Sequence, residues 1–311
     1  MKNIIGSLLL LMVVSIGYAR EHAHGADQYA PAIDTTIPAG HLRIHYTVSG
    51  HGPALLLLHA GYQDLHMWDT QATFFQRNYQ VVRMDMPGHG LTTGVDTNLL
   101  VADVIRIVLD SLHIGKVCIA GVSMGAACAT DFVLAYPERV SRLILVSPGL
   151  SGWPAVMKMD SASGAIFTRM DSIRATGDHQ LMARHFTEIW CDGPFRRPEE
   201  VDKRVRDYIY TTTEHNQMND TAFPVFNRRR AATRLKEIKC PVLIIQGDKD
   251  VPFTLRVMQW YRHELPAAAF VHFPGVAHMV NMEKAKEFDR VVYRWLKEAG
   301  SSETMPPSHS Q

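Results

Sequence analysis

Gly121-Val122-Ser123-Met124-Gly125 decides how this chain folds, because this Gly-x-Ser-x-Gly pattern stands between two regular segments. The apolar run from Lys116 to Ala120 precedes it and predicts a strand, and the stretch from Ala126 to Leu134 follows and predicts a helix. In that setting a sharp turn lifts the serine hydroxyl clear of the sheet, and small glycines permit close backbone packing. Ser123 is therefore the predicted nucleophile.

Apolar runs and helical stripes alternate on both sides of this turn. Ala54 to Leu58 is continuously apolar, which suits a central parallel strand covered on both faces, and residues 98–113 carry apolar side chains at helical spacing. Further strands are expected at residues 42–48, 80–85, 142–146, 241–246 and 270–273. Such alternation predicts an α/β fold with a doubly wound, mostly parallel sheet, which binds ligands at the carboxyl ends of its strands.

The chain divides into four expected parts. Residues 1–19 have the pattern of a secretory signal peptide: Lys2, then an apolar run too short for a comfortable membrane span, then small residues at Gly17-Tyr18-Ala19. We therefore expect export to the periplasm or the medium and no stable membrane span after cleavage; an uncleaved anchor is the alternative. Residues 20–149 and 237–300 form the expected core, residues 150–236 a helical lid, and residues 301–311 a disordered tail.

Charge and cysteine content exclude several classes of protein. The formal net charge is +1, and removal of Lys2 with the signal leaves 31 basic against 31 acidic residues, so nucleic acid is not an expected partner. The spacing of His22 and His24 matches no closed metal site, and neither a metal nor a cofactor is expected. Free thiols are favoured for the cysteines, although export would permit disulfides. The sequence does not predict the oligomeric state.

A serine nucleophile needs a base, and the base needs an acid that holds its tautomer. Asp250 stands three residues past Gly247, which ends an apolar strand, so it lies on the same rim of the sheet as Ser123. Asp248 comes too soon after that strand and is expected to cap it or to face solvent. His278 follows the last strand and reaches the same rim, and its ordinary pKa near neutrality suits a general base. The predicted triad is Ser123, Asp250 and His278.

The developing alkoxide of acyl transfer needs two backbone N–H donors. Met124, the residue after the nucleophile, supplies the first expected donor. The second is expected from the loop after the Ala54 strand, with Gly61 as the choice and Tyr62 as the alternative. His59 and His89 are interpreted as structural residues that tie their loops together.

On these motifs the sequence resembles the α/β-hydrolase superfamily from about residue 33 to residue 298. The motifs are Leu58-His59-Ala60-Gly61, Asp85-Met86-Pro87-Gly88-His89-Gly90, the Gly121 elbow, Gly247-Asp248-Lys249-Asp250 and Gly275-Val276-Ala277-His278. The resemblance implies the α/β-hydrolase fold with an inserted helical lid. Residues 189–194 and 197–202 look like the lids of single-domain esterases and enol-lactonases similar to 3-oxoadipate enol-lactonase.

The chain also departs from some branches of that superfamily. Ser123 replaces the Asp of haloalkane dehalogenases and epoxide hydrolases, and Met124 replaces the Trp usual in prolyl aminopeptidase-like members. Ala60 interrupts the triple-glycine loop of many lipases. The export signal argues against a cytosolic role in aromatic catabolism.

Together these features predict an exported serine hydrolase that cleaves a small or medium carboxylic ester or lactone through an acyl-enzyme on Ser123. The acyl pocket is expected from lid and loop side chains, whose alternative role is packing of the lid itself: Tyr62, Trp153, Met159, Phe167, Met170, Phe186 and Trp190. One alternative function is a ligand sensor with slow or no turnover. Another is carbon–carbon bond hydrolysis or cofactor-free peroxidation with the same triad.

Overall fold

A computed structural model of the chain describes residues 31–216 and 230–298. The predicted signal peptide (1–19), the predicted tail (301–311) and residues 217–229 of the predicted lid lie outside the described residues. Within the described ranges, no helix combines the length and the apolar character needed to cross a bilayer.

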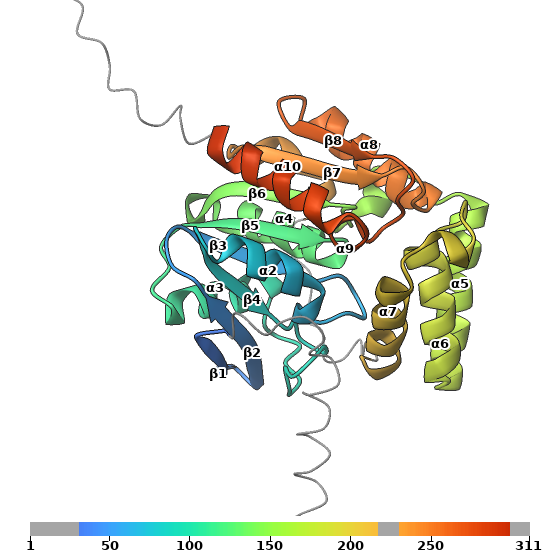
Figure 1. The fold of residues 1–311 in the computed structure, drawn as a ribbon, viewed down its shortest axis with the longest axis horizontal. Coiled ribbons are helices and arrows are strands. Elements are labelled where there is room, and N and C mark those ends of the chain that lie inside the picture. Colours follow the sequence, from blue (N-terminus) through green and yellow to red (C-terminus); the bar gives the residue numbers. More distant parts are fainter. Residues whose placement is uncertain (1–30, 217–229, 299–311) are drawn as a thin grey trace, which may run out of the picture.

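One eight-stranded sheet forms the centre of the molecule, in the order β1-β2-β4-β3-β5-β6-β7-β8 (Figure 1). The strands are β1 (Ile33–Ala39), β2 (Leu42–Ser49), β3 (Ala54–Leu58), β4 (Gln80–Met84), β5 (Val117–Val122), β6 (Val140–Val146), β7 (Val242–Gly247) and β8 (Ala269–Phe273). The strands β1 and β2 form an antiparallel hairpin, β2 pairs antiparallel with β4, and the remaining neighbours are parallel. The predicted mostly parallel sheet is therefore confirmed.

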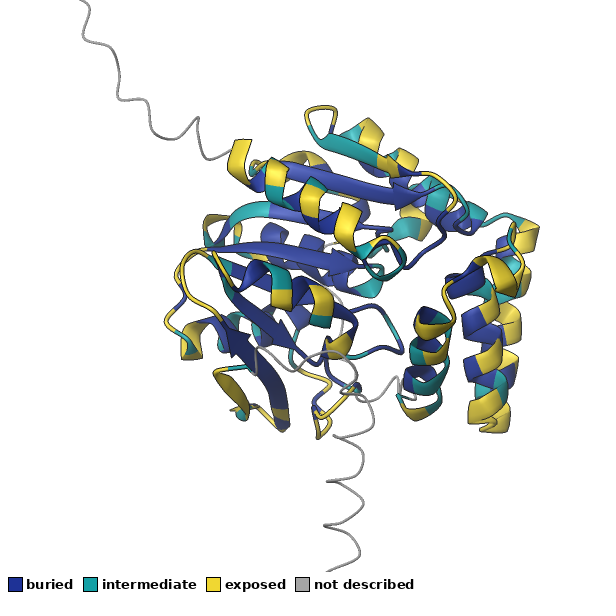
Figure 2. Cartoon of the chain, viewed as in Figure 1, coloured by how far each residue is buried: buried dark blue, intermediate teal, exposed yellow. Residues whose placement is uncertain are grey.

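Helices cover both faces of this sheet, as a doubly wound fold requires. One buried cluster joins a sheet face to α3 (Val101–Ser111), α4 (Met124–Ala135) and α8 (Pro252–Glu264). A second cluster joins the opposite face to α2 (Asp69–Phe75) and α10 (Ala285–Glu298). In Figure 2 the central strands are mostly dark blue, whereas most of the surrounding helices carry both buried and exposed residues. Two-sided burial explains why β3 and β5 are continuously apolar in sequence.

Short helical segments complete the core around these elements. They are η1 (Leu65–Trp68), η2 (Pro137–Arg139), η7 (Leu235–Glu237) and α9 (Val280–Glu283).

The segment between β6 and β7 is helical in its described part and contains no strand there. Its helices are α5 (Ser161–Thr176), α6 (His179–Phe186) and α7 (Lys203–His215), with short segments η3 (Trp153–Ala155), η4 (Thr187–Asp192), η5 (Pro198–Glu200) and η6 (Ala231–Thr233). We call the described part of this segment, residues 150–216 and 230–236, the helical insert. Figure 1 shows α5, α6 and α7 beside the edge toward which β5 and β7 point. The insert thus stands next to the carboxyl ends of the strands.

Candidate active site

Ser123 occupies a strained turn between β5 and α4. Its backbone has φ 53° and ψ −111°, a left-handed conformation that non-glycine residues rarely adopt. Its N–H donates to the Val146 carbonyl (3.0 Å), and its own carbonyl accepts from the N–H groups of Ala127 and Gly149 (3.0 Å each). These bonds hold the turn in place, and strain of this kind is characteristic of functional sites.

The two glycines of the elbow are needed because other backbone lies against them. A Cβ on Gly121 would lie 2.3 Å from the carbonyl carbon of Gly125, and a Cβ on Gly125 would lie 2.3 Å from the Leu58 carbonyl oxygen. The start of α4 therefore packs directly on the end of β3. This close approach brings the loop after β3 next to Met124.

Asp250 and His278 form a buried hydrogen-bonded pair. His278 Nδ1 lies 2.7 Å from Asp250 Oδ2, and the two side chains are 3% and 0% exposed. The second carboxylate oxygen accepts from the Val251 N–H (2.7 Å), which fixes the orientation of Asp250. Because Nδ1–H donates to the carboxylate, the Nε2 atom is left to act as a base.

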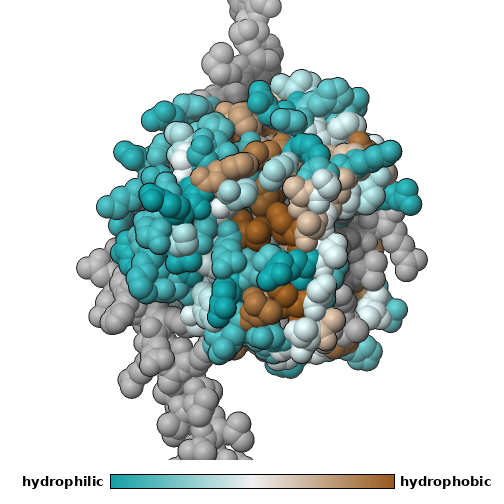
Figure 3. Space-filling model, turned by 90° about the vertical axis from the view of Figure 1, so that its right-hand side faces the viewer, coloured by the Kyte–Doolittle hydropathy of each residue, from teal (hydrophilic) through white to brown (hydrophobic). Residues whose placement is uncertain are grey.

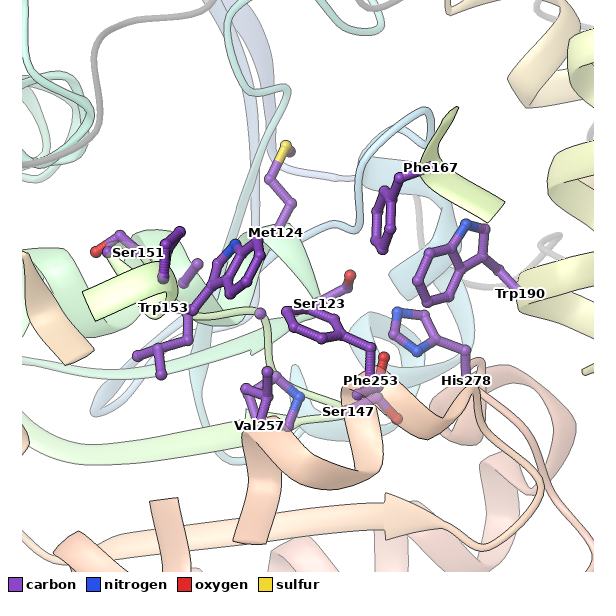
Figure 4. A pocket seen from close by; sticks show the side chains of 17 residues that line it. Ser123, Met124, Ser147, Ser151, Trp153, Phe167, Trp190, Phe253, Val257 and His278 are labelled. Atoms are coloured by element: carbon purple, nitrogen blue, oxygen red, sulfur yellow. The ribbon is translucent and has the colours of Figure 1, made fainter. Parts of the chain in front are cut away.

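Ser123 and His278 line the same cavity, and their side chains are neighbours in Figure 4. Across the described residues, no hydrogen bond joins the Ser123 hydroxyl to His278. Such contacts commonly tighten only when a substrate is bound.

Asp248, the acid set aside in the sequence analysis, holds the turn rather than the base. Its Oδ1 accepts from the Gly275 N–H (2.7 Å), and the Lys249 N–H donates to the Val276 carbonyl (2.8 Å). A Cβ on Gly247 would lie 2.2 Å from the Val276 carbonyl oxygen. The loop that carries Asp250 and the loop that carries His278 are therefore packed backbone to backbone.

Arg196 connects the helical insert to the loop of His278, a role that sequence reasoning missed. Its guanidinium forms a bidentate ion pair with Glu283 (2.6 and 3.0 Å) and donates to the Gly275 carbonyl (3.0 Å). It also donates to the carbonyls of Cys191 and Asp192 at the end of η4. Burial raises the pKa of the Glu283 carboxyl, an effect that Arg196 opposes. No sequence pattern distinguishes this arginine from the other arginines nearby in the chain.

Two neutral histidines organise the loop after β3. His59 Nδ1 donates to the Ala60 carbonyl (2.8 Å), and its Nε2 accepts from the Met86 N–H (2.9 Å). His89 Nδ1 donates to the Pro87 carbonyl (3.0 Å), and its Nε2 accepts from the Tyr62 N–H (3.2 Å). Burial lowers the pKa of His59, and burial together with the neighbouring His59 lowers the pKa of His89 to about 3. Both side chains thus tie loops together.

This arrangement distinguishes the two expected oxyanion donors on the loop. The Tyr62 N–H is already bonded to His89, whereas the N–H groups of Gly61 and Met124 make no hydrogen bond to any described residue. Met124 lines the cavity beside Ser123. The Tyr62 N–H is thus engaged with His89 and the Gly61 N–H is not, although Gly61 is not among the residues that line the cavity.

A cavity of about 400 Å³ opens beside Ser123 and has mostly apolar walls. Of the expected pocket residues, Trp153, Phe167 and Trp190 line it (Figure 4). The Trp190 ring lies 4.7 Å from the His278 ring, centroid to centroid. Figure 3 shows the face toward which the parallel strands run, where apolar side chains gather in a central patch with hydrophilic groups around it.

Four of the residues that the sequence analysis expected in the acyl pocket do not line the cavity. The structure places them in packed interior positions instead. Tyr62, Met170 and Phe186 are buried in the second core cluster, and Met159 packs against the first. The Tyr62 ring lies 5.1 Å from the Phe186 ring, and its hydroxyl accepts from Arg174 (2.9 Å). Because the insert is itself a packed helical layer, these side chains fill its interior or its contact with the core.

The structure adds cavity residues that sequence reasoning missed: Ser147, Leu150, Ser151, Phe253, Thr254 and Val257. The last three belong to α8, which begins two residues after Asp250. A usable signal was present, since a helix that starts beside the acid must present its first turn to the same rim.

The described residues hold no candidate metal centre and no disulfide. No cluster of three or more His, Cys, Asp or Glu side chains with a geometry for metal binding occurs among residues 31–216 and 230–298. All four cysteines are free, and Cys118, Cys128 and Cys191 are buried. Burial raises the pKa of the Cys118 thiol to about 12, so it stays protonated near neutral pH.

The amino-acid sequence is similar to a known protein family and to several characterised hydrolases. Residues 53–285 match the family described as "alpha/beta hydrolase fold". A 2-hydroxy-6-oxononadienedioate/2-hydroxy-6-oxononatrienedioate hydrolase of Burkholderia vietnamiensis is 29% identical over 277 residues, which cover 82% of this chain and 91% of that protein. A pimeloyl-[acyl-carrier protein] methyl ester esterase of Nitrosomonas europaea is 24% identical over 79% of this chain and 96% of its own length.

Solved structures agree on the fold. The enol-lactonase from Burkholderia xenovorans superposes with a TM-score of 0.67 at 19% identity, covering 84% of this chain and 99% of that one. The strand order, the elbow at Ser123 and the match over residues 53–285 lead to one conclusion. The chain belongs to the α/β-hydrolase fold family.

Proposed function

We propose that the protein is an exported serine hydrolase that cleaves a small or medium carboxylic ester or lactone through an acyl-enzyme on Ser123. The observation that carries the proposal is the buried Asp250–His278 hydrogen bond of 2.7 Å, made at the rim where Ser123 lines the same cavity. A serine, a histidine and a carboxylate in these relations are the parts that acyl transfer needs. Export rests on the pattern of residues 1–19.

In the first half of the reaction, Ser123 Oγ attacks the substrate carbonyl carbon while His278 Nε2 takes the serine proton. The negative charge on the carbonyl oxygen is stabilised by the N–H groups of Met124 and Gly61. The bond to the leaving alcohol then breaks, and His278 returns the proton to the alcohol oxygen. Asp250 stabilises the imidazolium ion throughout.

In the second half, His278 takes a proton from water, which attacks the acyl-enzyme. The carboxylic acid leaves, and Ser123 recovers its proton from His278. A cavity of about 400 Å³ with mostly apolar walls suits an acyl group of small to medium size.

Carbon–carbon bond hydrolysis is a second candidate that one comparison favours. The Burkholderia vietnamiensis relative is named for a 2-hydroxy-6-oxo dienedioate, a compound whose name contains no ester, so its hydrolysis must cleave a carbon–carbon bond. The same triad order supports either chemistry. The cavity walls, which include Trp153, Phe253 and Val257, are mostly apolar and contain no Lys or Arg among the described residues, and this disfavours the two carboxylates of a dienedioate as the substrate of this chain.

The test is a substrate panel of p-nitrophenyl esters, lactones, amides and vinylogous diketones, run on the wild type and on Ser123→Ala. Covalent labelling of Ser123 with a fluorophosphonate is measured by intact mass on the same preparations. Labelling together with faster turnover of esters or lactones than of diketones supports the proposal. Faster turnover of the diketones would replace it with the second candidate, and an unlabelled Ser123 in folded protein would remove both.

A further inference from the structure

One turn of the helical insert lies directly against the catalytic histidine. This turn, η4, is π-helical, and single π-helical turns are frequent at functional sites. Its Trp190 ring lies 4.7 Å from the His278 ring, centroid to centroid, with 51° between the two planes (Figure 4). The bond from Asp250 fixes only the Nδ1 atom of the imidazole. The position of the Nε2 atom therefore also depends on where η4 holds the indole.

Gly193, the residue after η4, packs on both loops of the triad. A Cβ at this position would lie 2.4 Å from the Lys249 carbonyl oxygen and 2.8 Å from the Ala277 Cβ. Lys249 precedes Asp250, and Ala277 precedes His278. Gly193 has φ 78°, in the region that favours glycine. The end of η4 is therefore in direct contact with the backbone that carries the acid and with the residue before the base.

Arg196 fastens this contact with every donor of its guanidinium. Its Nε donates to the Asp192 carbonyl (2.7 Å) and its Nη2 to the Cys191 carbonyl (2.6 Å), both at the end of η4. Its Nη1 donates to the Gly275 carbonyl (3.0 Å). The two remaining N–H groups donate to the Glu283 carboxylate (2.6 and 3.0 Å). The side chains of Arg196 and Glu283 are 5% and 7% exposed, and all five donors are used.

The partners of Arg196 stand on both sides of the catalytic base in the chain. Gly275 comes shortly before His278, and Glu283 comes shortly after it at the end of α9. Arg196 itself is absent from the described residues that line the cavity. An effect of Arg196 on the reaction must therefore reach His278 through the backbone of its loop and through the indole of Trp190.

Arg206 provides a comparison on the same turn. Its guanidinium forms a bidentate ion pair with Asp192 (2.6 and 3.1 Å), so it too holds the end of η4. Arg206 lies on α7, and the hydrogen bonds of its guanidinium to described residues stay within the insert. The two arginines thus separate a bond inside the insert from bonds that join the insert to the loop of the base.

We propose that Arg196 is a positioning residue of the triad, which holds the Trp190 indole against His278 so that the imidazole Nε2 stays directed at Ser123. The inference rests on the function proposed above. Lysine cannot replace Arg196, because a single ammonium group has three donors and lacks the planar fork that matches a carboxylate. Misplacement of a catalytic group by about 1 Å lowers a rate by up to about 10²-fold.

The test measures how fast a fluorophosphonate inactivates each variant, with labelling of Ser123 followed by intact mass. In this reaction Ser123 Oγ displaces fluoride from phosphorus while His278 takes the serine proton. Saturation kinetics separates the chemical step, kinact, from binding, KI. We expect Arg196→Lys to lower kinact by about 10-fold or more and to leave KI unchanged. Arg206→Lys is the matched control, and its kinact is expected to equal that of the wild type.

A double variant tests whether Arg196 acts through Trp190. Trp190→Leu is expected to lower kinact by itself, because the imidazole loses the contact with the indole. The variant that carries both Arg196→Lys and Trp190→Leu is expected to have the kinact of the more affected single variant, since both changes remove the same support. Circular dichroism and thermal unfolding verify that each variant is folded at the assay temperature.

Glu283→Gln provides a second route if Arg196→Lys does not fold. This substitution leaves the three carbonyl bonds of Arg196 in place and weakens the ion pair. We expect it to lower kinact by about 3-fold. A kinact like that of the wild type in this variant would contradict the proposal.

Three further results would overturn the inference while leaving the function intact. They are a kinact like that of the wild type in Arg196→Lys, an equal loss of kinact in Arg196→Lys and Arg206→Lys, and losses that multiply in the double variant. Failure of the proposed function would look different, because Ser123 would then remain unlabelled by the fluorophosphonate in the wild type.

Discussion

At the scale of single residues, the site depends on how two neighbouring aspartates are used. Asp250 bonds His278 Nδ1, whereas Asp248 bonds the Gly275 N–H in the turn that leads to His278. One carboxylate therefore faces the imidazole and the other supports the backbone that carries it. Replacing each aspartate by asparagine distinguishes the two roles. The Asp250 variant tests the orientation of the His278 imidazole, and the Asp248 variant tests the support of the loop that carries it.

Asp250→Asn should lower kcat for p-nitrophenyl acetate by about 10²-fold or more, because an amide neither fixes the Nδ1–H tautomer nor stabilises the imidazolium. Asp248→Asn should lower it by less than about 10-fold, since it weakens the Gly275 hydrogen bond and removes the ion pair with Lys249 but leaves the Asp250–His278 pair in place. Steady-state kinetics gives kcat for both variants, and circular dichroism verifies that both are folded. Equal effects of the two substitutions would contradict the assignment of Asp250.

The sequence predicted those residues of the site whose positions follow from strand ends. Ser123, Asp250 and His278 could be placed because each follows the carboxyl end of a strand, after one, three and five residues respectively. Cavity residues were harder to place, because an apolar side chain on a helix of the insert fits a pocket wall and a packed interior equally well. Met170 and Phe186 lie in the interior, while Phe167 and Trp190 reach the cavity.

At the scale of elements, the contact between β3 and α4 sets the geometry around Ser123. A Cβ on Gly125 would lie 2.3 Å from the Leu58 oxygen and 2.6 Å from the His59 oxygen. Backbone on both sides leaves no flexible side chain that could move aside. The helix, the nucleophile and the expected oxyanion loop are therefore held in one arrangement.

Gly125→Ala should destabilise the protein by more than about 2 kcal/mol, because the added methyl group overlaps backbone atoms. The matched control is Gly164→Ala in α5, where a Cβ would meet nothing within 4 Å. That control should stabilise the protein by about 0.5–1 kcal/mol, the usual gain for alanine over glycine inside a helix. Urea unfolding followed by circular dichroism measures both, and a neutral Gly125→Ala would refute the close packing.

Strands were more predictable than the elements of the insert for a physical reason. The strands β3 and β7 are covered on both faces, so nearly every side chain is apolar and the signal is continuous. The helices of the insert are partly exposed, so their composition is mixed. The anchoring role of Arg196 depends on Gly275 and Glu283, which are 79 and 87 residues away and cannot be paired from sequence.

At the scale of the whole molecule, stability at acid pH is a sum of opposing contributions. The pKa of His89 is lowered to about 3, mainly by burial, from an ordinary value of 6.5. The unfolded chain therefore binds more protons than the folded one between these values, so His89 makes the protein less stable as the pH falls through that window. Burial raises the pKa of Asp289 to about 6 from 3.8, which has the opposite sign.

Comparison of His89→Gln with the wild type isolates the histidine contribution. The wild type should lose up to about 1.4 kcal/mol more stability per pH unit than the variant as the pH falls below about 6.5. His51→Gln, a substitution of an exposed histidine in the turn before β3, is the control and should follow the wild type. Urea unfolding at pH 7, 6 and 5 gives the curves, and parallel curves for the wild type and His89→Gln would contradict a buried neutral His89.

The most direct test of the account concerns Ser123 itself. Turnover of p-nitrophenyl acetate is measured for the wild type, for Ser123→Ala and for Ser172→Ala, an exposed serine of α5 whose hydroxyl donates to the Thr168 carbonyl. Ser123→Ala should reduce kcat by a factor of about 10³ or more, and Ser172→Ala should leave it unchanged. Activity like that of the wild type in a folded Ser123→Ala variant would contradict the central claim.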